Sequence, residues 1–186
     1  MDKATGLLEP ARWCPSPNRD ARPQGAAPTL VVLHGISLPP GRFGGPEIEA
    51  LFTNTLDWDA HPYFAEIRGA RVSAHLLVRR DGSVVQFVPL TERAWHAGES
   101  CFRGHERCND FSIGIELEGE DETPYDERQY PALQNVMRAI VAAYPAISAR
   151  ELAAHSDVAP GRKTDPGPAF DWFRLYDGLS EGKGAT

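Results

Sequence analysis

The segment AHSDVAPGRKTDPGP, from Ala154 to Pro168, holds one histidine and two aspartates, and two of these, His155 and Asp165, ten positions apart, are candidate metal ligands. Its three prolines and two glycines interrupt any regular helix or strand, so a loop can fold both side chains onto one ion. A catalytic zinc ion takes three protein ligands and leaves a fourth position for water. His34, at the end of an apolar run, is the best candidate for the third ligand. On their own, such residues without a local spacing rule occur by chance in many chains.

Hydrolysis at such a metal needs two further groups, and the sequence offers both. A carboxylate near the metal can activate water, and Glu116 is the candidate because it alternates with the apolar residues Ile115 and Leu117. A fixed cation can stabilise a developing oxyanion, and Lys163 lies two residues before Asp165. A strand glutamate and a loop lysine are more often simply solvated, so the residues alone leave both roles open.

Hydrophobic periodicity predicts the elements that hold these side chains. TLVVLH, from Thr29 to His34, is apolar on both alternating faces, which is typical of a central strand buried on both sides. His34 falls at the carboxyl end of this strand, where rigid elements can present side chains to ligands. FSIGIELEG, from Phe111 to Gly119, alternates instead. Its apolar residues are expected to face the core, with Ser112, Gly114, Glu116 and Glu118 on the other face.

The remaining elements complete a mixed α/β (α+β) fold, a single domain in which a mixed β-sheet is flanked by helices. Residues 46–56 and 170–176 are predicted helices, and Asp81-Gly82 predicts a hairpin between two β-rich runs. A longer helix is predicted to begin at a Thr123 cap, with an apolar stripe of Tyr130, Leu133, Met137, Ile140, Val141 and Tyr144. We expect residues 1–28 to be an irregular lead-in, residues 29–178 to form the functional domain and residues 179–186 to be a mobile tail.

Composition narrows the class of protein. The chain has 186 residues, 41% of them hydrophobic, which is enough for one domain with a sizeable core. A net charge of −7 disfavours non-specific binding to nucleic acid or to an anionic membrane. The three cysteines have no C-x-x-C spacing, and the N-terminal residues lack the apolar run of a secretion signal. We therefore expect a cytoplasmic protein and, because no interface motif is apparent, a monomer.

Five ordered segments carry a resemblance to a known family: LHGISLPPGRFGGPEIEALF, VSAHLLVRRDGSVVQFVPL, RAWHAGES, ERCNDFSIGIELEG and HSDVAPGRKTDPGPAFDW. The chain resembles the zinc N-acetylmuramoyl-L-alanine amidases of the peptidoglycan-recognition superfamily, and among them the cytoplasmic enzymes that act on anhydro-muropeptides. The resemblance extends from about Trp13 to Tyr176. It implies one zinc ion per chain, held by the residues His34, His155 and Asp165. It also implies Glu116 as general base or water-orienting carboxylate and Lys163 as the group that polarises the carbonyl.

The reaction that the resemblance implies is hydrolysis of the amide between the lactyl group of 1,6-anhydro-N-acetylmuramic acid and L-alanine of the stem peptide. Such an enzyme recycles cell-wall fragments in the cytoplasm and affects β-lactamase induction in organisms that have that circuit. Trp95 resembles the residue on the sugar side of the substrate, and Arg71 and Arg107 resemble those near the peptide carboxylates. Without the resemblance, a tryptophan is more often a core residue and surface arginines are mostly solvated.

One position departs from the family pattern, and two other functions stay open. The first zinc histidine of the family is usually followed by asparagine, whereas Gly35 follows His34 here, which puts substrate affinity in doubt but leaves the ligand itself in place. Members that bind peptidoglycan without cutting it tend to lack a zinc ligand, and all three candidates are present. A lytic amidase of the intact wall would be expected to carry a leader, a wall-binding repeat or a basic surface, and none is visible in the sequence.

Overall fold

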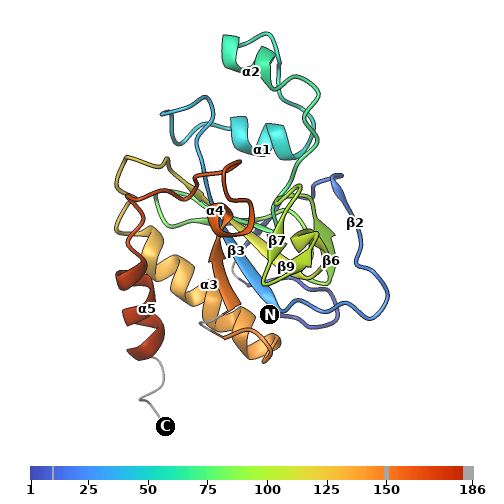
Figure 1. The fold of residues 1–186 in the computed structure, drawn as a ribbon. Helices are drawn as coiled ribbons and strands as arrows, with labels where there is room; N and C mark the ends of the chain where they lie inside the picture. The colour runs from blue at the N-terminus through green and yellow to red at the C-terminus, as the bar shows by residue number, and fades with distance from the viewer. Residues whose placement is uncertain (10, 149–150, 182–186) are drawn as a thin grey trace.

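A six-stranded mixed sheet is the centre of the computed structural model, which describes residues 1–9, 11–148 and 151–181 (Figure 1). The strand order is β1-β5-β4-β9-β3-β10. The six strands are β1 (Arg12–Trp13), β3 (Leu30–Ile36), β4 (Leu76–Val78), β5 (Val84–Gln86), β9 (Ser112–Glu118) and β10 (Leu152–Ala154). β4, β9, β3 and β10 run parallel, while β5 pairs antiparallel with β4. The predicted mixed sheet is confirmed, and so is the hairpin turn at Asp81-Gly82.

Two layers of helices cover the sheet. On one face, α3 (Gln129–Ala143) and α5 (Trp172–Glu181) pack on a core that includes Val31, Leu33, Ile113, Ile115 and Leu117. On the other face, α1 (Glu47–Phe52) and α2 (Pro62–Glu66) pack with Leu77, Val85 and Phe87. Figure 1 shows α3 and α5 side by side at the lower left and α1 and α2 at the top. The short α4 (His155–Val158) follows β10 and lies against β3.

The two central strands explain where polar residues can be buried. β3 and β9 are each seven residues long, and β9 is buried on both faces along its whole length. Burial of both faces is usual for a central parallel strand. The second face of β9 carries the polar residues, as expected, but it is buried as well, so the expectation that it points away from the packed part of the protein is wrong. Glu116 and Glu118 are 8% and 2% exposed, so each is a buried carboxylate that requires an explanation.

Several predicted helix boundaries and burials differ from the structure. The long helix begins at Gln129 rather than after Thr123, which places Pro131 in its first turn, where no intrahelical N–H donor is required. Val141 on this helix is exposed, whereas Val136, which the predicted stripe omitted, is buried. The first helix ends at Phe52, and the last helix begins at Trp172 and continues to Glu181, beyond the predicted end at Tyr176.

The N-terminal segment is more regular than expected. β1 lies within residues 1–28 and adds an edge strand to the main sheet, parallel to β5. β2 (Arg19–Ala21) pairs antiparallel with β6 (Glu92–Ala94) in a separate two-stranded sheet, so this segment is not a purely irregular lead-in. Strands β7 (Cys101–Phe102) and β8 (His105–Glu106) form another small sheet, followed by a 3₁₀ turn at Cys108–Asp110. Residues 182–186 of the predicted tail lie outside the described residues.

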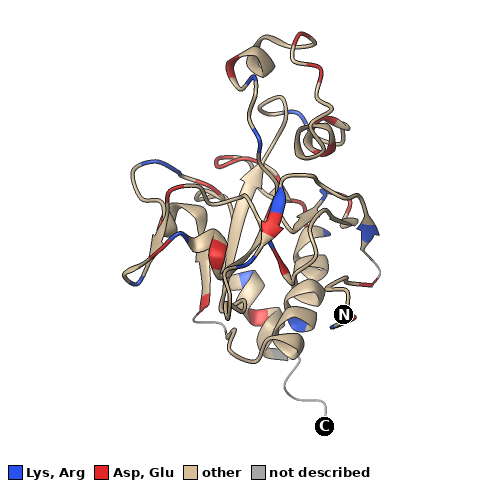
Figure 2. Cartoon of the chain, turned by 90° about the vertical axis from the view of Figure 1, so that its right-hand side faces the viewer, with Lys and Arg blue, Asp and Glu red and all other residues tan. Residues whose placement is uncertain are grey.

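Charged residues are interspersed in the view of Figure 2, where Lys and Arg alternate with Asp and Glu along the chain. The three cysteines, Cys14, Cys101 and Cys108, are free thiols. Among the helices in the described part of the chain, none combines the length and the apolar character needed to cross a bilayer.

Candidate metal centre and its cleft

The carboxyl ends of three parallel strands bring the predicted site residues together. His34 on β3 is in register with Glu116 on the adjacent β9, so both side chains lie on the same face of the sheet. β10 pairs with β3 on its other side and ends at Ala154, which places His155 directly at this edge. Asp165 lies in the loop after α4, and its carbonyl oxygen accepts a hydrogen bond from the Ser156 N–H at 3.1 Å. The loop thereby returns to the residues beside His155.

Three potential ligand atoms converge at this edge. His34 Nδ1 is 2.9 Å from His155 Nδ1, Asp165 Oδ2 is 3.0 Å from His155 Nδ1, and it is 3.4 Å from His34 Nδ1. Donor atoms in a tetrahedral zinc site lie about 3.3 Å apart, given zinc–ligand bonds of about 2.0–2.1 Å. The three side chains thus have nearly the mutual spacing of zinc ligands, and this group could hold a metal ion.

Hydrogen bonds on the far side of each ring indicate which nitrogen carries the proton. His155 Nε2 lies 3.4 Å from the carbonyl oxygen of Ala97, which can only accept, so the proton is assigned to Nε2 and the lone pair to Nδ1. His34 Nε2 is 2.9 Å from His96 Nδ1, and His96 Nε2 is 3.1 Å from Ser112 Oγ. With His34 Nε2–H donating to His96 Nδ1 and His96 Nε2–H donating to Ser112 Oγ, the Nδ1 atom of His34 also keeps a lone pair. Partners of this kind usually orient metal-ligating histidines.

The charge states of these groups suit a cation. Burial lowers the pKa of His34 to about 4, so this ring is neutral near pH 7. Burial would raise the pKa of Asp165, but hydrogen bonding to His155 and His34 prevails and holds it below its ordinary value. With Nδ1 of each ring deprotonated, two nitrogen lone pairs and one carboxylate oxygen would face a common centre. This set of donor atoms fits a zinc ion, which binds nitrogen and carboxylate ligands.

Glu116 is a buried carboxylate beside this centre. Its Oε2 atom has no hydrogen-bond partner within the described residues. Burial raises the pKa of Glu116 well above its ordinary value, the negative charge of Asp165 raises it further, and Lys163 opposes both. A buried, unpartnered acid with a shifted pKa at the wall of a cleft is typical of a functional residue rather than of a solvated surface glutamate.

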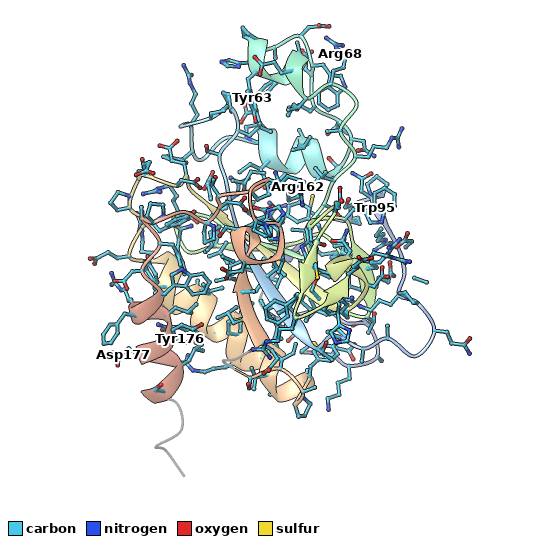
Figure 3. The ribbon with its side chains drawn as sticks, viewed as in Figure 1. Tyr63, Arg68, Trp95, Arg162, Tyr176 and Asp177 are labelled. Carbon is cyan, nitrogen blue, oxygen red and sulfur yellow. The ribbon has the colours of Figure 1, made fainter. Side chains whose placement is uncertain are left out.

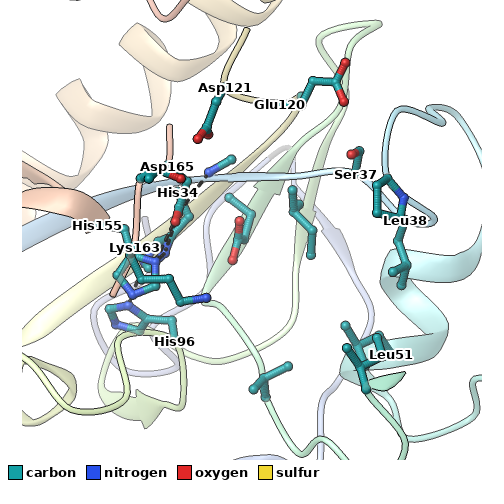
Figure 4. Close-up of a pocket in the computed structure, with 18 of the residues that line it drawn as sticks. His34, Ser37, Leu38, Leu51, His96, Glu120, Asp121, His155, Lys163 and Asp165 are labelled. Atoms are coloured by element: carbon teal, nitrogen blue, oxygen red, sulfur yellow. Dashed lines mark hydrogen bonds and ion pairs between the residues drawn. The ribbon is translucent and has the colours of Figure 1, made fainter. Parts of the chain in front are cut away.

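An open cleft of about 890 Å³ adjoins the metal-type cluster. Figure 4 shows His34, His155, Asp165, Lys163 and His96 grouped at one end and Leu38 and Leu51 at the other. Lys163 is exposed and lines the cleft. Three acidic residues, Glu120, Asp121 and Glu122, also line the cleft, and Figure 4 labels the first two. A ligand in this cleft would meet a polar end that carries the candidate ligands and an apolar wall from α1 and the loop after β3.

None of the three residues predicted to bind substrate lines this cleft, although Arg71 and Trp95 are chain neighbours of residues that do. Arg71 is exposed and Trp95 is half-buried, and neither lines it. Arg107 is exposed, pairs with Asp110 at 2.7 Å and lines a second cavity of about 640 Å³. These placements leave their substrate contacts untested.

Two residues that sequence reasoning missed line the cleft instead. Arg162 lines both the cleft and the second cavity, and it donates to the carbonyl oxygens of Ala97 and Glu99 at 2.5 and 2.6 Å. Tyr63 on α2 lines the cleft from above (Figure 3). The position of Arg162 directly before Lys163 was a usable signal, whereas nothing near Tyr63 in the sequence indicated its position.

Comparison with known proteins agrees with this geometry. The family model described as N-acetylmuramoyl-L-alanine amidase matches residues 24–168. The 1,6-anhydro-N-acetylmuramyl-L-alanine amidase AmpD of Enterobacter cloacae is 61% identical over 171 residues, covering 92% of this chain and 91% of that protein. AmpD of Escherichia coli strain K12 is 61% identical over 170 residues, covering 91% of this chain and 92% of that protein.

Solved structures agree as well. The crystal structure of a selenomethionine AmpD derivative matches with a TM-score of 0.92 at 57% identity, covering 94% of this chain and 97% of that one. The amidase AmiD from E. coli, solved with the substrate anhydro-N-acetylmuramic acid-L-Ala-D-γ-Glu-L-Lys, matches with a TM-score of 0.59 at 32% identity. That match covers 84% of this chain and 60% of AmiD. The chain therefore belongs to the N-acetylmuramoyl-L-alanine amidase family, and over nearly its whole length it is similar to the AmpD amidases.

Proposed function

We propose that this enzyme is a zinc-dependent amidase that cleaves the bond between the lactyl group of 1,6-anhydro-N-acetylmuramic acid and L-alanine of the stem peptide. The observation that carries the proposal is the convergence of His34 Nδ1, His155 Nδ1 and Asp165 Oδ2 beside the buried Glu116, at the wall of an open cleft. The choice of substrate is supported by the names of the AmpD relatives, which are about 60% identical.

The metal would occupy the centre between His34, His155 and Asp165. A zinc ion there would supply Lewis acidity, which makes water a better nucleophile at neutral pH and polarises a carbonyl oxygen. The chain's own contribution is to hold the three ligands: one on β3, one at the start of α4 and one in the loop that follows α4. The imidazole partners His96 and Ala97 O would fix the two rings in the orientation that the metal needs.

Glu116 and Lys163 would carry out the proton transfer and the charge stabilisation. The carboxylate of Glu116 takes a proton from the attacking water while the oxygen of that water forms a bond to the lactyl carbonyl carbon. The ammonium group of Lys163 stabilises the negative charge that develops on the carbonyl oxygen. The C–N bond then breaks, and the proton held by Glu116 passes to the leaving amine of L-alanine. The products are a lactyl carboxylic acid and a peptide amine, which together contain all the atoms of the amide and the water. At neutral pH the proton of the acid passes to the amine, giving a carboxylate and an ammonium group, so atoms and charges balance.

The cleft has room for a muropeptide, and its two ends differ in polarity. The apolar wall at Leu38 and Leu51 and the exposed cations Arg162 and Lys163 would suit a ligand with a sugar and peptide carboxylates. Trp95, Arg71 and Arg107 stay predictions for the sugar and carboxylate contacts. We further propose that the enzyme acts as a monomer in the cytoplasm, on wall fragments that are being recycled.

The first experiment is a mass-spectrometric assay on anhydro-muramyl tripeptide, with the protein as isolated, after chelation and after zinc is restored. Release of free tripeptide that stops on chelation and returns with zinc is the expected result. Asp165→Ala should lose bound zinc and activity together, whereas Asp177→Ala, at an exposed position on α5 (Figure 3), should keep both. Activity that survives complete chelation, or an Asp165→Ala variant with full zinc content, would contradict the proposed function.

A further inference from the structure

Tyr125 packs against Gly35, the residue that follows His34. Tyr125 is 5% exposed, and its ring lies over two glycines at the ends of the central strands, Gly35 on β3 and Gly119 just after β9. A Cβ atom at Gly35 would overlap Tyr125 Oη, and a Cβ atom at Gly119 would overlap the ring carbons. Because protein interiors are close-packed, neither glycine can gain a side chain while Tyr125 keeps this position.

The hydroxyl of Tyr125 reaches the loop that carries the third candidate ligand. Tyr125 Oη donates to the carbonyl oxygen of Pro166 at 2.9 Å, in a buried hydrogen bond between residues 41 positions apart. Pro166 directly follows Asp165, and the Gly35 N–H lies 3.4 Å from Asp165 Oδ2. Gly35 therefore contacts the ligand through its backbone and leaves the space through which Tyr125 reaches the next residue.

We propose that Tyr125 is a positioning residue for the metal ligand Asp165, and that Gly35 provides the space this requires. His34 lies on β3 and His155 begins α4 directly after β10, but Asp165 lies in a loop whose neighbours Lys163 and Thr164 are exposed. A loop ligand needs an anchor from the folded core to keep its oxygen within bonding distance of a metal. The hydrogen bond from Tyr125 to Pro166 is such an anchor, one residue from the ligand. This inference rests on the proposed function, because it assumes that Asp165 binds zinc.

Tyr130 offers a matched comparison for Tyr125. Both rings are buried and pack on Phe170, with ring centroids 5.4 Å apart for Tyr125 and 5.5 Å apart for Tyr130. The hydroxyl of Tyr130 accepts a hydrogen bond from the Asp171 N–H at 3.0 Å, in a different part of the loop. Removing either hydroxyl deletes one hydrogen bond, which is buried at Tyr125 and partly buried at Tyr130, but only the removal at Tyr125 releases the residue beside Asp165.

The first test compares Tyr125→Phe with Tyr130→Phe by zinc affinity and by thermal unfolding of the zinc-free protein. Tyr125→Phe should raise the zinc dissociation constant about tenfold or more, as for other residues that orient metal ligands, and should alter the visible absorption spectrum of the cobalt-substituted protein. Tyr130→Phe should leave the zinc dissociation constant and the cobalt spectrum unchanged. The two variants should lower the unfolding temperature of the zinc-free protein by similar amounts. Equal zinc affinity in the wild type and Tyr125→Phe would overturn the proposal.

The second test is a double-mutant cycle with Gly35→Ala. Alone, Gly35→Ala should weaken zinc binding, because the new methyl group displaces the Tyr125 hydroxyl. In the Tyr125→Phe background it should have little further effect, because the next atoms, Pro166 Cα and Tyr125 Cζ, lie 3.4 and 3.6 Å from the added Cβ. Additive effects would overturn the proposed link between Gly35 and Tyr125. Wild-type protein that binds no zinc would overturn the proposed function as well, whereas a zinc-binding wild type with unaffected variants would overturn this inference alone.

Discussion

Replacement of Glu116 by glutamine is the most informative perturbation of the site. The substitution keeps the shape of the side chain but removes its ability to accept a proton. Oε2 of Glu116 has no partner within the described residues, so the change deletes no hydrogen bond to that atom. A general base contributes about 10²–10⁴-fold to rate, which corresponds to about 3–5 kcal/mol of transition-state stabilisation. We expect kcat to fall within that range while zinc content stays at the wild-type level.

The same substitution should change how stability depends on pH. Burial raises the pKa of Glu116, so the folded zinc-free protein retains a proton that the unfolded chain releases. The free energy of unfolding of the zinc-free wild type therefore falls as pH rises from the ordinary glutamate value of 4.5 toward the raised value. Glutamine does not titrate. The stability of Glu116→Gln relative to the wild type should thus increase with pH above about 4.5 and then level off.

The two effects are measured separately. Steady-state release of tripeptide gives kcat and KM, metal analysis gives zinc content, and denaturant unfolding of the zinc-free proteins at several pH values gives the stability difference. A Glu116→Gln variant with a rate within about threefold of the wild type would refute the role of base, given the expected range. A stability difference that stays constant with pH would refute the raised pKa, even if activity were lost.

Three further changes test other parts of the structure. Ser112→Ala removes the acceptor of His96 Nε2, which in turn contacts His34, and should weaken zinc binding about tenfold in a chelator competition without preventing folding. Ile115→Ala deletes a fully buried side chain from the centre of β9 and should lower the free energy of unfolding by about 2–5 kcal/mol in a denaturant titration. Phe173→Ser, at a residue 80% exposed on α5, should change stability by about 0.5 kcal/mol or less in the same titration and leave activity unchanged.

The elements of the fold that could be predicted from the sequence are those with a long pattern of apolar and polar residues. The apolar run to His34 and the alternation around Glu116 predicted β3 and β9 to within two residues, because seven-residue central strands leave a long pattern. The predicted start of α3 was wrong because Thr123 and Pro124 have the composition of a helix cap. In the structure Thr123 instead forms an isolated antiparallel β-bridge with Glu120, and the helix begins only at Gln129. Short edge strands such as β1 are set by pairing partners far along the chain, and two residues carry no periodicity.

The candidate ligands that converge at this strand edge could be predicted from the sequence, whereas the residues that contact and position them could not. His34, Glu116, His155 and Asp165 were found because each is a chemically specific residue in an apolar or irregular setting, and the structure brings them to one strand edge. Tyr125 could not be found in this way, because a buried tyrosine in a turn has the same local pattern whether it fills space or anchors a ligand. Its contacts with Gly35 and Pro166 join residues far apart in the sequence.

The division between strand-borne and loop-borne ligands explains why supports of this kind are needed. His34 is fixed by hydrogen-bonded neighbours on both sides, β9 and β10, and His155 begins α4 directly after β10. Asp165 has no such ladder, since its loop is interrupted by proline and glycine. Asp165 is held instead by the backbone hydrogen bond from the Ser156 N–H to its carbonyl oxygen and, at the next residue, by the side-chain hydrogen bond from Tyr125 to Pro166. On this reasoning, substitutions at Tyr125 and Gly35 should affect zinc binding more than their distance from the reacting atoms suggests, whereas core substitutions such as Ile115→Ala should affect stability first.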